Sequence, residues 1–574
     1  MYNIAKNKKN TVTGILLEYL SDSSAGVVLT IYNGKTQIDM TSRDIHENSL
    51  RWASYLYSVG IHNRYTVLII YPLSPILIYL FIGSIFLGCL PILYGTPRTQ
   101  HMKYYVNNIY LLVKKYSIKF LVIDYETFNN NFQLFNIIES AGCRIIVAPR
   151  DLDSEPLSIK KINFPRPQDV MLLQLTSGTT SLQKLCPYSH RMIIGHSQNQ
   201  FGSFNISRKD VIVNWTPLYH DMGLMCNFIF AFIHRIRLVM IPPLAFIMHP
   251  FIWLKAMHAF KGTITWAPNF AFAVCVDRIN LKRYPEIDLS HVRMFINASE
   301  TISPGTFNKF YAKFSRCGLK REALTTSYGC AENTGTIAVS KLSKPVTIIS
   351  IKRKSLINGK VELFRQGKVN KFSKGKVDLV SLGCALPGNK ITIRRKDNVI
   401  LSEMEIGEIV CKSNTTIKKY YKQRRLTTQN LKNGWLRTGD LGFLKNDELF
   451  FVGRIDEEIK IAGIKYFPSE IEQVINAING VRKGCMAAFG VFDEALGTNR
   501  LVVLAESRLK NQEARERLVC NIKKEIAQRF GLTCYDVIVL PQGMLQKTTS
   551  GKKMHQEMKY RYLNGEFSVN KRLP

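Results

Sequence analysis

The sequence predicts an α/β protein with a large N-terminal domain of doubly wound sheets, a small β subdomain and a small α+β C-terminal domain. Residues 11–160 alternate apolar, strand-like runs with helical stretches, a rhythm typical of a parallel sheet covered by helices. From residue 382 the chain turns to short strands with Gly-Pro turns, and beyond residue 456 it mixes strands with one long helix. At 574 residues it is too long for a single core, so two or more domains are expected.

The segment 41–60 is predicted as an amphipathic helix of the first α/β unit. Ser42 is expected as its N-cap, and Leu50, Ala53 and Leu56 lie on one face at helical spacing. Strand-like runs follow in the next 90 residues or so, and the same alternation resumes after residue 211. These elements predict the doubly wound layer.

The segment 67–94 is almost uncharged and long enough to suggest a membrane span. Pro72, Pro75 and Pro91 divide it into a short run, a helix-length middle and a second short run. Because proline interrupts helices, we predict a strand, a buried helix and a strand here, and no transmembrane segment.

Composition and charge indicate a globular protein. Apolar residues make up 46% and charged residues 21%, which excludes a disordered chain. The net charge of +35 suits a nucleic acid, an acidic protein partner or a genome biased towards lysine and asparagine, and charge alone does not separate these. The twelve cysteines form no C-x-x-C pair, and residues 1–10 lack the apolar core of a signal peptide, so a reducing, cytoplasmic location is predicted.

A candidate phosphate-binding loop follows the strand-like run 169–175. Thr176-Ser177-Gly178-Thr179-Thr180 is rich in hydroxyls, Lys184 comes shortly after, and Ser189 opens a predicted helix. Loop amides and hydroxyls can donate to phosphate oxygens while the lysine supplies charge. The triplet Gln183-Lys184-Leu185 excludes a Walker A loop. A plain polar turn is the alternative for this motif in isolation.

Further polar residues follow strand-like runs downstream. His220 comes after the run 211–215, where open α/β sheets bind ligands, and could orient a carboxylate, although a structural histidine is the commoner case. Tyr328 offers an aromatic face, Gly329 allows close backbone approach, and Glu332 has the oxygen ligands that magnesium prefers. Ser299 and Glu300 form a similar small-residue turn. Each has an ordinary loop explanation on its own.

The segment 341–376 has eleven Lys and Arg residues against the single acid Glu362. We predict a surface insertion, as a hairpin, and both a solvated loop and a docking surface remain open. Beyond it, Asp440 lies in a turn suited to paired hydroxyls, and Lys552 follows a glycine in a polar loop from which it could reach a cleft. A domain boundary is predicted near Asp456.

These motifs, in this order, resemble the adenylate-forming superfamily of acyl-CoA synthetases, luciferases and peptide-synthetase adenylation domains. More narrowly, the chain is similar to fatty acyl-AMP ligases. The resemblance runs from about residue 11 to residue 567 and is closest at 215–224, 242–246, 267–278, 435–454 and 547–562. It implies an AMP-binding domain over 1–455, with the basic insertion where these ligases differ from CoA-using relatives, and a mobile C-terminal domain over 456–574.

The resemblance also implies roles for matching residues. Asp456 would be the hinge, and Lys552, His220 and Glu332 would be catalytic, with Glu332 holding Mg²⁺. The nucleotide would be bound by Thr176, Ser177, Gly178, Thr179, Thr180, Lys184, Ser299, Glu300, Tyr328, Gly329, Asp440 and Arg454, and the acyl pocket would be lined by Phe228, Phe232, Trp266 and Phe270.

The implied reaction uses ATP and Mg²⁺. A fatty acid carboxylate attacks the α-phosphorus, pyrophosphate leaves, and the acyl group passes to the phosphopantetheine of an acyl carrier protein in lipid or polyketide/peptide biosynthesis. Carrier proteins are usually acidic, which suits the +35 chain, and no specific nucleic acid is implied. A fatty acyl-CoA ligase is the first alternative, favoured slightly by the Asp456 hinge. The second is a weakened relative with a binding role, because Ser181, Gln183 and Leu185 replace the family's glycine, proline and glycine and could strain the loop.

Overall fold

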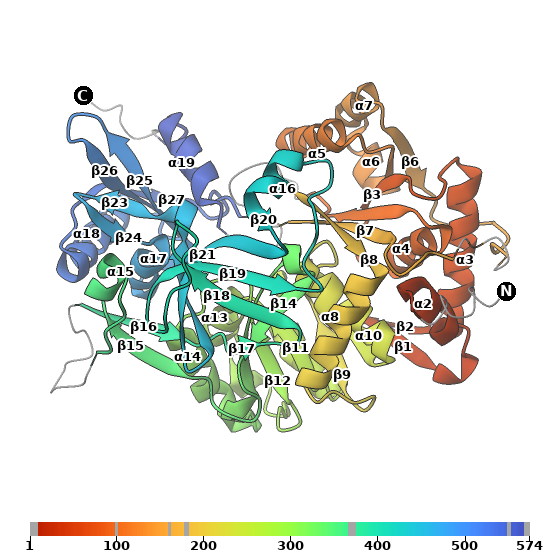
Figure 1. Ribbon diagram of the computed structural model, residues 1–574, viewed down its shortest axis with the longest axis horizontal. Helices are drawn as coiled ribbons and strands as arrows, with labels where there is room; N and C mark the ends of the chain where they lie inside the picture. The colour runs from red at the N-terminus through yellow and green to blue at the C-terminus, as the bar shows by residue number, and fades with distance from the viewer. Residues whose placement is uncertain are drawn as a thin grey trace.

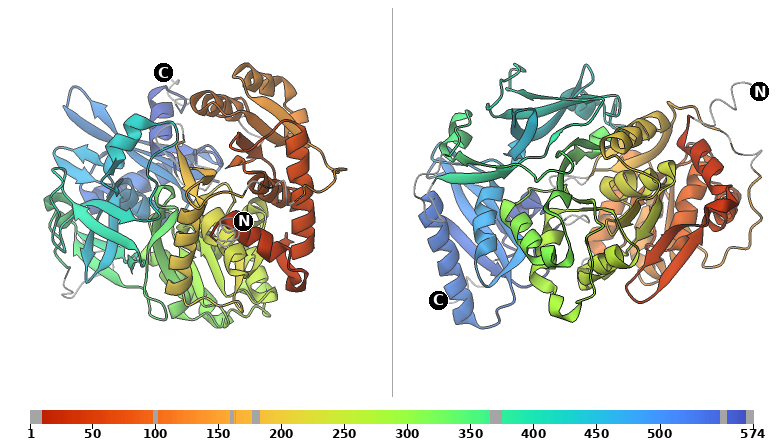
Figure 2. Two further views of the ribbon diagram at one scale, coloured as in Figure 1. Left: turned by 45° about the vertical axis from the view of Figure 1, so that its right-hand side comes forward. Right: turned by 90° about the horizontal axis from the view of Figure 1, so that it is seen from below.

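The computed structural model describes residues 10–97, 102–158, 162, 164–176, 183–364, 375–547 and 553–567. Figure 1 shows two lobes, with the C-terminal elements gathered at one end of the molecule. The two further views in Figure 2 show the same separation, so the fold is the predicted large α/β lobe followed by a smaller one.

A nine-stranded sheet forms the centre of the large lobe, in the order β17-β14-β13-β12-β11-β9-β10-β1-β2. The six strands from β13 to β1 are parallel, and the remaining pairings at the two edges are antiparallel. The strands are β1 Val27–Tyr32, β2 Gln37–Thr41, β9 Val211–Asn214, β10 Arg237–Met240, β11 Ile264–Ala267, β12 Met294–Asn297, β13 Leu324–Cys330, β14 Gly335–Val339 and β17 Cys384–Ala385. Helices α2 Val12–Leu20, α8 His190–Ser203, α10 Phe230–His234, α11 Pro243–Met248, α12 Phe251–Ala259, α13 Asn269–Arg278 and α14 Pro304–Phe314 accompany these strands.

A second, four-stranded parallel sheet has the order β4-β3-β5-β6. Its strands are β3 Thr66–Ile70, β4 Leu90–Tyr94, β5 Phe120–Asp124 and β6 Arg144–Ala148, with helices α3 Ser42–Ser58, α4 Pro75–Leu87, α5 Met102–Tyr116, α6 Tyr125–Asn129 and α7 Phe132–Ser140. The strand, buried helix and strand predicted over 67–94 are β3, α4 and β4. Among the described residues, no helix is long and apolar enough to cross a membrane.

The expected N-cap of α3 was wrong by one residue. Thr41 caps the helix, because its hydroxyl accepts from the Asp44 amide at 3.1 Å while the Asp44 carboxylate accepts from the Thr41 amide at 3.0 Å. This reciprocal capping box satisfies two amides that Ser42 alone could not.

The two strands that flank the candidate phosphate loop in sequence pair antiparallel. Strand β7 Val170–Leu175 pairs with β8 Leu185–Ser189, and α8 then begins with Ser189 as its N-cap. The sequence predicted a strand, a loop and a helix, but the structure has a further strand, β8, between the loop and the helix. Leu185 pairs with Leu175 in ordinary extended backbone and has no positive φ, so the strain expected there is absent, while Ser181 lies outside the described residues.

A β subdomain and the basic insertion complete the large lobe. The subdomain sheet has the order β18-β19-β21-β20, with β22 paired to β21. Its elements are β18 Asn389–Arg394, β19 Gly407–Ser413, α16 Arg424–Asn430, β20 Leu431–Lys432, β21 Trp435–Lys445 and β22 Glu448–Arg454. The predicted insertion 341–376 contains β15 Ile348–Lys352 and α15 Lys354–Asn358. Strand β15 pairs antiparallel with β16 Lys376–Val380, so the second strand begins at the last residue of the insertion and continues beyond it. Within the expected bounds, an isolated bridge joins Ile351 to Leu363.

The small lobe contains a three-stranded sheet in the order β25-β26-β27, covered by helices. The short turn Ile455–Glu457 leads into it from β22. Its elements are β23 Ile459–Ile461, β24 Ile464–Tyr466, α17 Pro468–Ala477, β25 Val481–Asp493, β26 Thr498–Ser507, α18 Gln512–Phe530, β27 Cys534–Leu540 and α19 His555–Leu563. Ile471, Ile475 and Ile522 pack with the sheet in a core of its own, as expected for a separate folding unit.

Candidate active site

A cleft of about 1730 Å³ lies where the two lobes meet. Its walls come from the ends of β7, β12 and β13, from α13 and the β subdomain, and from α17, α18 and the start of α19. The carboxyl ends of parallel strands therefore open into it, as in other open α/β sheets that bind ligands. The predicted site residues that line it are Thr176, Lys184, His220, Phe270, Ser299, Glu300, Tyr328, Gly329, Glu332, Asp440 and Arg454.

The hairpin β7–β8 holds the two described ends of the phosphate loop together. The Thr176 amide donates to the Lys184 carbonyl at 2.9 Å, and the Lys184 amide donates to the Thr176 hydroxyl at 3.2 Å. The lysine ammonium lies 5.6 Å from the centre of the Tyr420 ring, a cation–π distance. Ser177, Gly178, Thr179 and Thr180 lie outside the described residues.

Glu332 faces this lysine side of the cleft and accepts a hydrogen bond of 2.8 Å from the Tyr420 hydroxyl. Burial, and then the negative charge of Glu332, raise the pKa of Tyr420 far above its ordinary value, so the phenol remains a donor. Among the described residues there is no group of three His, Cys, Asp or Glu side chains that could hold a metal ion. A single carboxylate of this kind fits Mg²⁺ that keeps waters and phosphate oxygens as its other ligands.

His220 lies at the start of the short helix Asp221–Gly223, beyond β9. Its Nδ1 is 2.8 Å from an Asp221 carboxylate oxygen and 3.1 Å from the Met222 amide, so these neighbours fix the ring. The Gln174 side-chain amide donates to the Tyr219 carbonyl at 2.9 Å and ties this loop to β7. This hydrogen bond connects the segment that carries His220 to the strand that leads into the phosphate loop.

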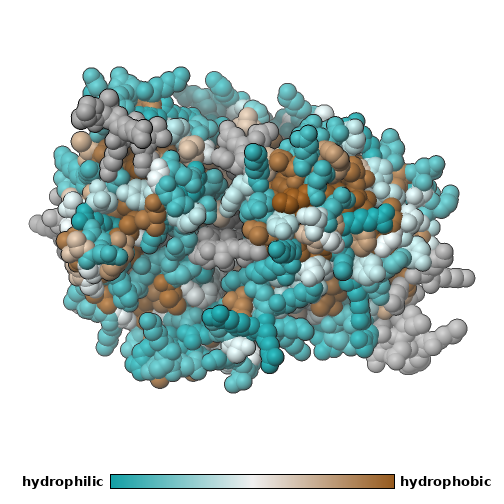
Figure 3. Space-filling model, turned by 90° about the horizontal axis from the view of Figure 1, so that it is seen from above, coloured by the Kyte–Doolittle hydropathy of each residue, from teal (hydrophilic) through white to brown (hydrophobic). Residues whose placement is uncertain are grey.

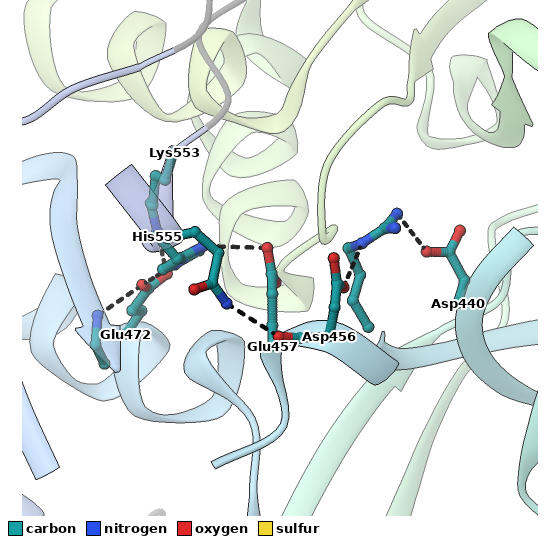
Figure 4. A network of polar contacts seen from close by, with 9 residues as sticks. Asp440, Asp456, Glu457, Glu472, Lys553 and His555 are labelled. Carbon is teal, nitrogen blue, oxygen red and sulfur yellow. Dashed lines mark hydrogen bonds and ion pairs between the residues drawn. The ribbon is translucent and has the colours of Figure 1, made fainter. Parts of the chain in front are cut away.

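Asp440 connects the nucleotide side of the cleft to the turn at Asp456. Its two carboxylate oxygens accept from the Tyr328 hydroxyl at 2.7 Å and from the Arg454 guanidinium at 2.8 Å. The same guanidinium also donates to Asp456 at 3.0 Å. Figure 4 shows Asp440 and Asp456 on either side of it. Burial disfavours the Arg454 cation, but Asp440 and Asp456 outweigh this and raise its pKa. The expected hinge residue is therefore paired directly with an expected nucleotide-binding residue.

The turn after β12 contacts the start of α13, and β13 lies very close to β14 at Gly329. Glu300 accepts from the Phe270 amide at 3.1 Å, and Ser299 has a φ of +73°, a strained value for serine. A Cβ at Gly329 would lie 2.3 Å from the Gly335 carbonyl oxygen, so only glycine fits between these strands.

The four expected acyl-pocket residues divide between the cleft wall and the core, where Phe228, Phe232 and Trp266 belong to one buried cluster. Phe270 lines the cleft, but Phe228, Phe232 and Trp266 are buried and do not line it. The Phe228 and Phe232 rings pack against each other with their centres 4.7 Å apart, and Trp266 packs near Phe204. Their assignment to an acyl pocket stays a prediction.

Lys553, in the C-terminal tail, lines the cleft. The expected catalytic residue Lys552 lies outside the described residues. Lys547 and Lys553 pair across the loop between them. Lys553 contacts the buried carboxylate of Glu472, which also lies 2.6 Å from His555, and His555 is 3.3 Å from Glu457 (Figure 4). The sequence did not predict this cluster, because Glu472 and His555 lie 83 positions apart and belong to no common motif. The contact of Tyr420 with Glu332 was not predicted either, since these residues lie 88 positions apart.

The family models match both lobes. Residues 25–421 match the AMP-binding enzyme family, and residues 456–572 match the AMP domain described as Disco-interacting protein 2-like. Because the first match spans more than half of the chain, the chain belongs to the AMP-binding enzyme family. Individual relatives and solved structures show which members of the family it is similar to.

A 4-hydroxyphenylalkanoate adenylyltransferase from Mycobacterium marinum is 29% identical over 446 residues, which cover 74% of this chain and 70% of the relative. The medium-chain-fatty-acid–[acyl-carrier-protein] ligase JamA from Moorena producens is 25% identical, with 96% of this chain and 95% of JamA covered. A solved structure from a study of fatty acyl-adenylate ligases of E. coli and L. pneumophila superposes with a TM-score of 0.87 at 22% identity. That comparison covers 97% of this chain and 99% of the other.

Proposed function

We propose that this protein is a fatty acyl-AMP ligase, which activates a fatty acid with ATP and transfers the acyl group to the phosphopantetheine of an acyl carrier protein. The observation that carries the proposal is the single cleft, which collects Lys184, His220, Glu332 and Asp440 from four separate segments. JamA, which aligns over nearly the whole chain, is named as a ligase of this type.

In the first step, the fatty acid carboxylate attacks the α-phosphorus of ATP, and the bond to pyrophosphate breaks. No protein nucleophile is required, so the residues contribute positioning and charge. We assign Lys184 and Thr176 to the triphosphate, together with Ser177, Gly178, Thr179 and Thr180. Lys552 would neutralise the developing charge at the α-phosphate.

We assign Glu332 to a magnesium ion that, when bound, would offset the negative charge of the phosphates. The Tyr420 hydroxyl at 2.8 Å orients this carboxylate. His220, fixed by Asp221, would lie beside the fatty acid carboxylate. Phe270 would form part of the acyl pocket at the cleft wall.

Tyr328 and Asp440 would receive the adenosine, with the ring stacked on adenine and the carboxylate accepting from the ribose hydroxyls. Both Asp440 oxygens are already engaged by Tyr328 and Arg454. The ribose would therefore join or exchange with these partners. Ser299, Glu300 and Gly329 would line the same side.

We further propose that residues 1–455 and 456–574 act as two domains that pivot at Asp456, so that one cleft serves both steps. The separate core of the small lobe supports this division. The insertion 341–376, which fatty acyl-AMP ligases carry and CoA-using relatives lack, favours a carrier protein as acceptor. The twelve cysteines are all free thiols, which supports a cytoplasmic location.

The test incubates the full chain with ATP, Mg²⁺ and a panel of fatty acids, alone, with CoA, and with a phosphopantetheinylated carrier protein, and identifies products by mass spectrometry. Acyl-AMP that passes to the carrier and not to CoA supports the proposal. Abundant acyl-CoA would instead make the protein a CoA ligase, and no adenylate from any acid would favour a binding role. Glu332→Gln should abolish adenylate formation, whereas Glu322→Gln, an exposed neighbour in sequence outside the cleft, should retain it.

A further inference from the structure

A strongly basic segment that the proposed mechanism does not use lies beside the phosphate loop. Between Glu408 and Asp440 the chain has no Asp or Glu. The same stretch has eight cations, namely Lys412, Lys418, Lys419, Lys422, Arg424, Arg425, Lys432 and Arg437. Five of these cations fall within residues 418–425, which lead into the first turn of α16. We call residues 418–425 the basic strip.

The basic strip is attached to the phosphate loop by its backbone. The Tyr421 amide donates to the Leu185 carbonyl at 2.9 Å, one residue beyond Lys184. Tyr420 lines the cleft and donates to Glu332. The strip therefore begins where we place the triphosphate and runs outward from it.

The end of α5 adds a further cation at this point. Lys422 donates to the Tyr116 carbonyl at 2.9 Å, and the Tyr116 hydroxyl donates to the Gln183 carbonyl at 3.0 Å. Burial, and then the charge of Lys184, lower the pKa of Lys115, which indicates that positive charges crowd together here.

All five cations of the basic strip, Lys418, Lys419, Lys422, Arg424 and Arg425, are exposed. In the described part of the chain, none of them forms an ion pair, whereas Arg437 in the same stretch pairs with Glu408. Like charges held together without counter-charges repel one another, and an anion relieves that repulsion. In Figure 1, α16 is seen near the upper edge of the molecule. The view from above in Figure 3 shows mostly hydrophilic residues on that side, with some hydrophobic patches.

We propose that the basic strip is an electrostatic approach path for the triphosphate of ATP and for the departing pyrophosphate. The inference rests on the proposed function, because it assumes that the phosphates lie at Thr176 and Lys184. The strip's cations do not themselves line the cleft, but they lie next to Tyr420, which does. A concentration of positive charge at the approach to a binding site raises the local concentration of an anionic ligand and its association rate by about 10- to 1000-fold, and salt weakens the effect. The strip's contacts with Leu185 and Glu332 favour phosphate over an acidic protein as its ligand.

The experiment measures association of a fluorescent ATP analogue with the full chain in Mg²⁺ by stopped flow, at ionic strengths from about 20 to about 300 mM. The variant replaces Lys418, Lys419, Arg424 and Arg425 by glutamine. We expect its association rate constant to fall about tenfold at low ionic strength and to depend less on salt, with dissociation changed less than about twofold. Arg424→Gln/Arg425→Gln alone should give an intermediate loss.

A matched control removes four exposed cations from segments that have no contact with the phosphate loop among the described hydrogen bonds, Lys282, Arg283, Arg316 and Lys320. It isolates the effect of position from that of net charge. An equal loss in both variants, or no loss in the strip variant, overturns the inference. So does a strip variant with wild-type nucleotide association that loads carrier protein slowly from preformed acyl-adenylate, since that marks a protein-docking surface. Failure of the wild-type chain to bind the analogue at all would contradict the proposed function itself, and the inference with it.

Discussion

Replacing Glu472 by glutamine should destabilise the small lobe strongly. The Glu472 side chain is only 5% exposed and contacts both Lys553 and His555. It also accepts from the Ala488 amide at 3.0 Å, which links α17 to β25. The change keeps the shape of the side chain but removes the anion that two largely, though not fully, buried cations share.

The magnitude follows from burial. Breaking a buried ion pair by removing one partner costs about 3–5 kcal/mol, because the remaining charge is left without compensation in a poorly solvated site. Burial would raise the pKa of Glu472, yet Lys553 and His555 outweigh it and lower that pKa to about 2. Burial would lower the pKa of His555, and Glu472 followed by Glu457 raises it to about 10. At this site the attraction between the charged groups therefore shifts both pKa values further than burial shifts them in the opposite direction.

These shifts set the pH range of the effect. Glu472 contributes stability above its unfolded pKa of about 4.5 and loses it as the pH falls towards 2. His555 contributes fully below its unfolded pKa of about 6.5 and loses the contribution as the pH rises towards 10. The difference between wild type and variant should thus be greatest between about pH 4.5 and pH 6.5 and decline on both sides.

The assay has to report on the small lobe, since all five tryptophans precede residue 456. Hydrogen exchange of peptides from α17 and α19, with urea unfolding followed by circular dichroism at pH 6, meets this need. Glu525→Gln is the control, because its i,i+4 pair with Arg529 is well solvated, with more than a third of each side chain exposed, and is worth less than about 0.5 kcal/mol. A loss below about 1 kcal/mol for Glu472→Gln at pH 6 would refute the reasoning.

Two further changes test other contacts. Arg353→Met should loosen the insertion from the small lobe, at a cost of about 3 kcal/mol, because Arg353 donates twice to the buried Glu470 at 3.1 Å. Faster hydrogen exchange in α17 would show this, and unchanged exchange would contradict it. Gly329→Ala should lower stability by about 1–3 kcal/mol, measured by thermal unfolding, since the added Cβ meets the Gly335 carbonyl. Gly202→Ala, with nothing within 4 Å of the added atom, should change it little.

Patterns local in sequence predicted a large part of the fold. The prolines at 72, 75 and 91 divided an apolar run into β3, α4 and β4. Periodicity located α3, but the choice between Thr41 and Ser42 as its cap depended on which hydroxyl reaches the Asp44 amide. Strand β8 was not predicted, because a strand of only five residues directly after a polar loop has too short a pattern to be distinguished from that loop.

For the site, the sequence alone determined which chemical groups are present and in what order, since motif residues such as Lys184, Glu332 and Asp440 belong to recognisable local turns. Only the tertiary structure decided which of them meet. Tyr420 reaches Glu332 across 88 positions, and Glu472 reaches His555 across 83. Such pairs depend on how helices and sheets pack, and the burial that strengthens them arises only when each lobe has folded, so no local pattern records them.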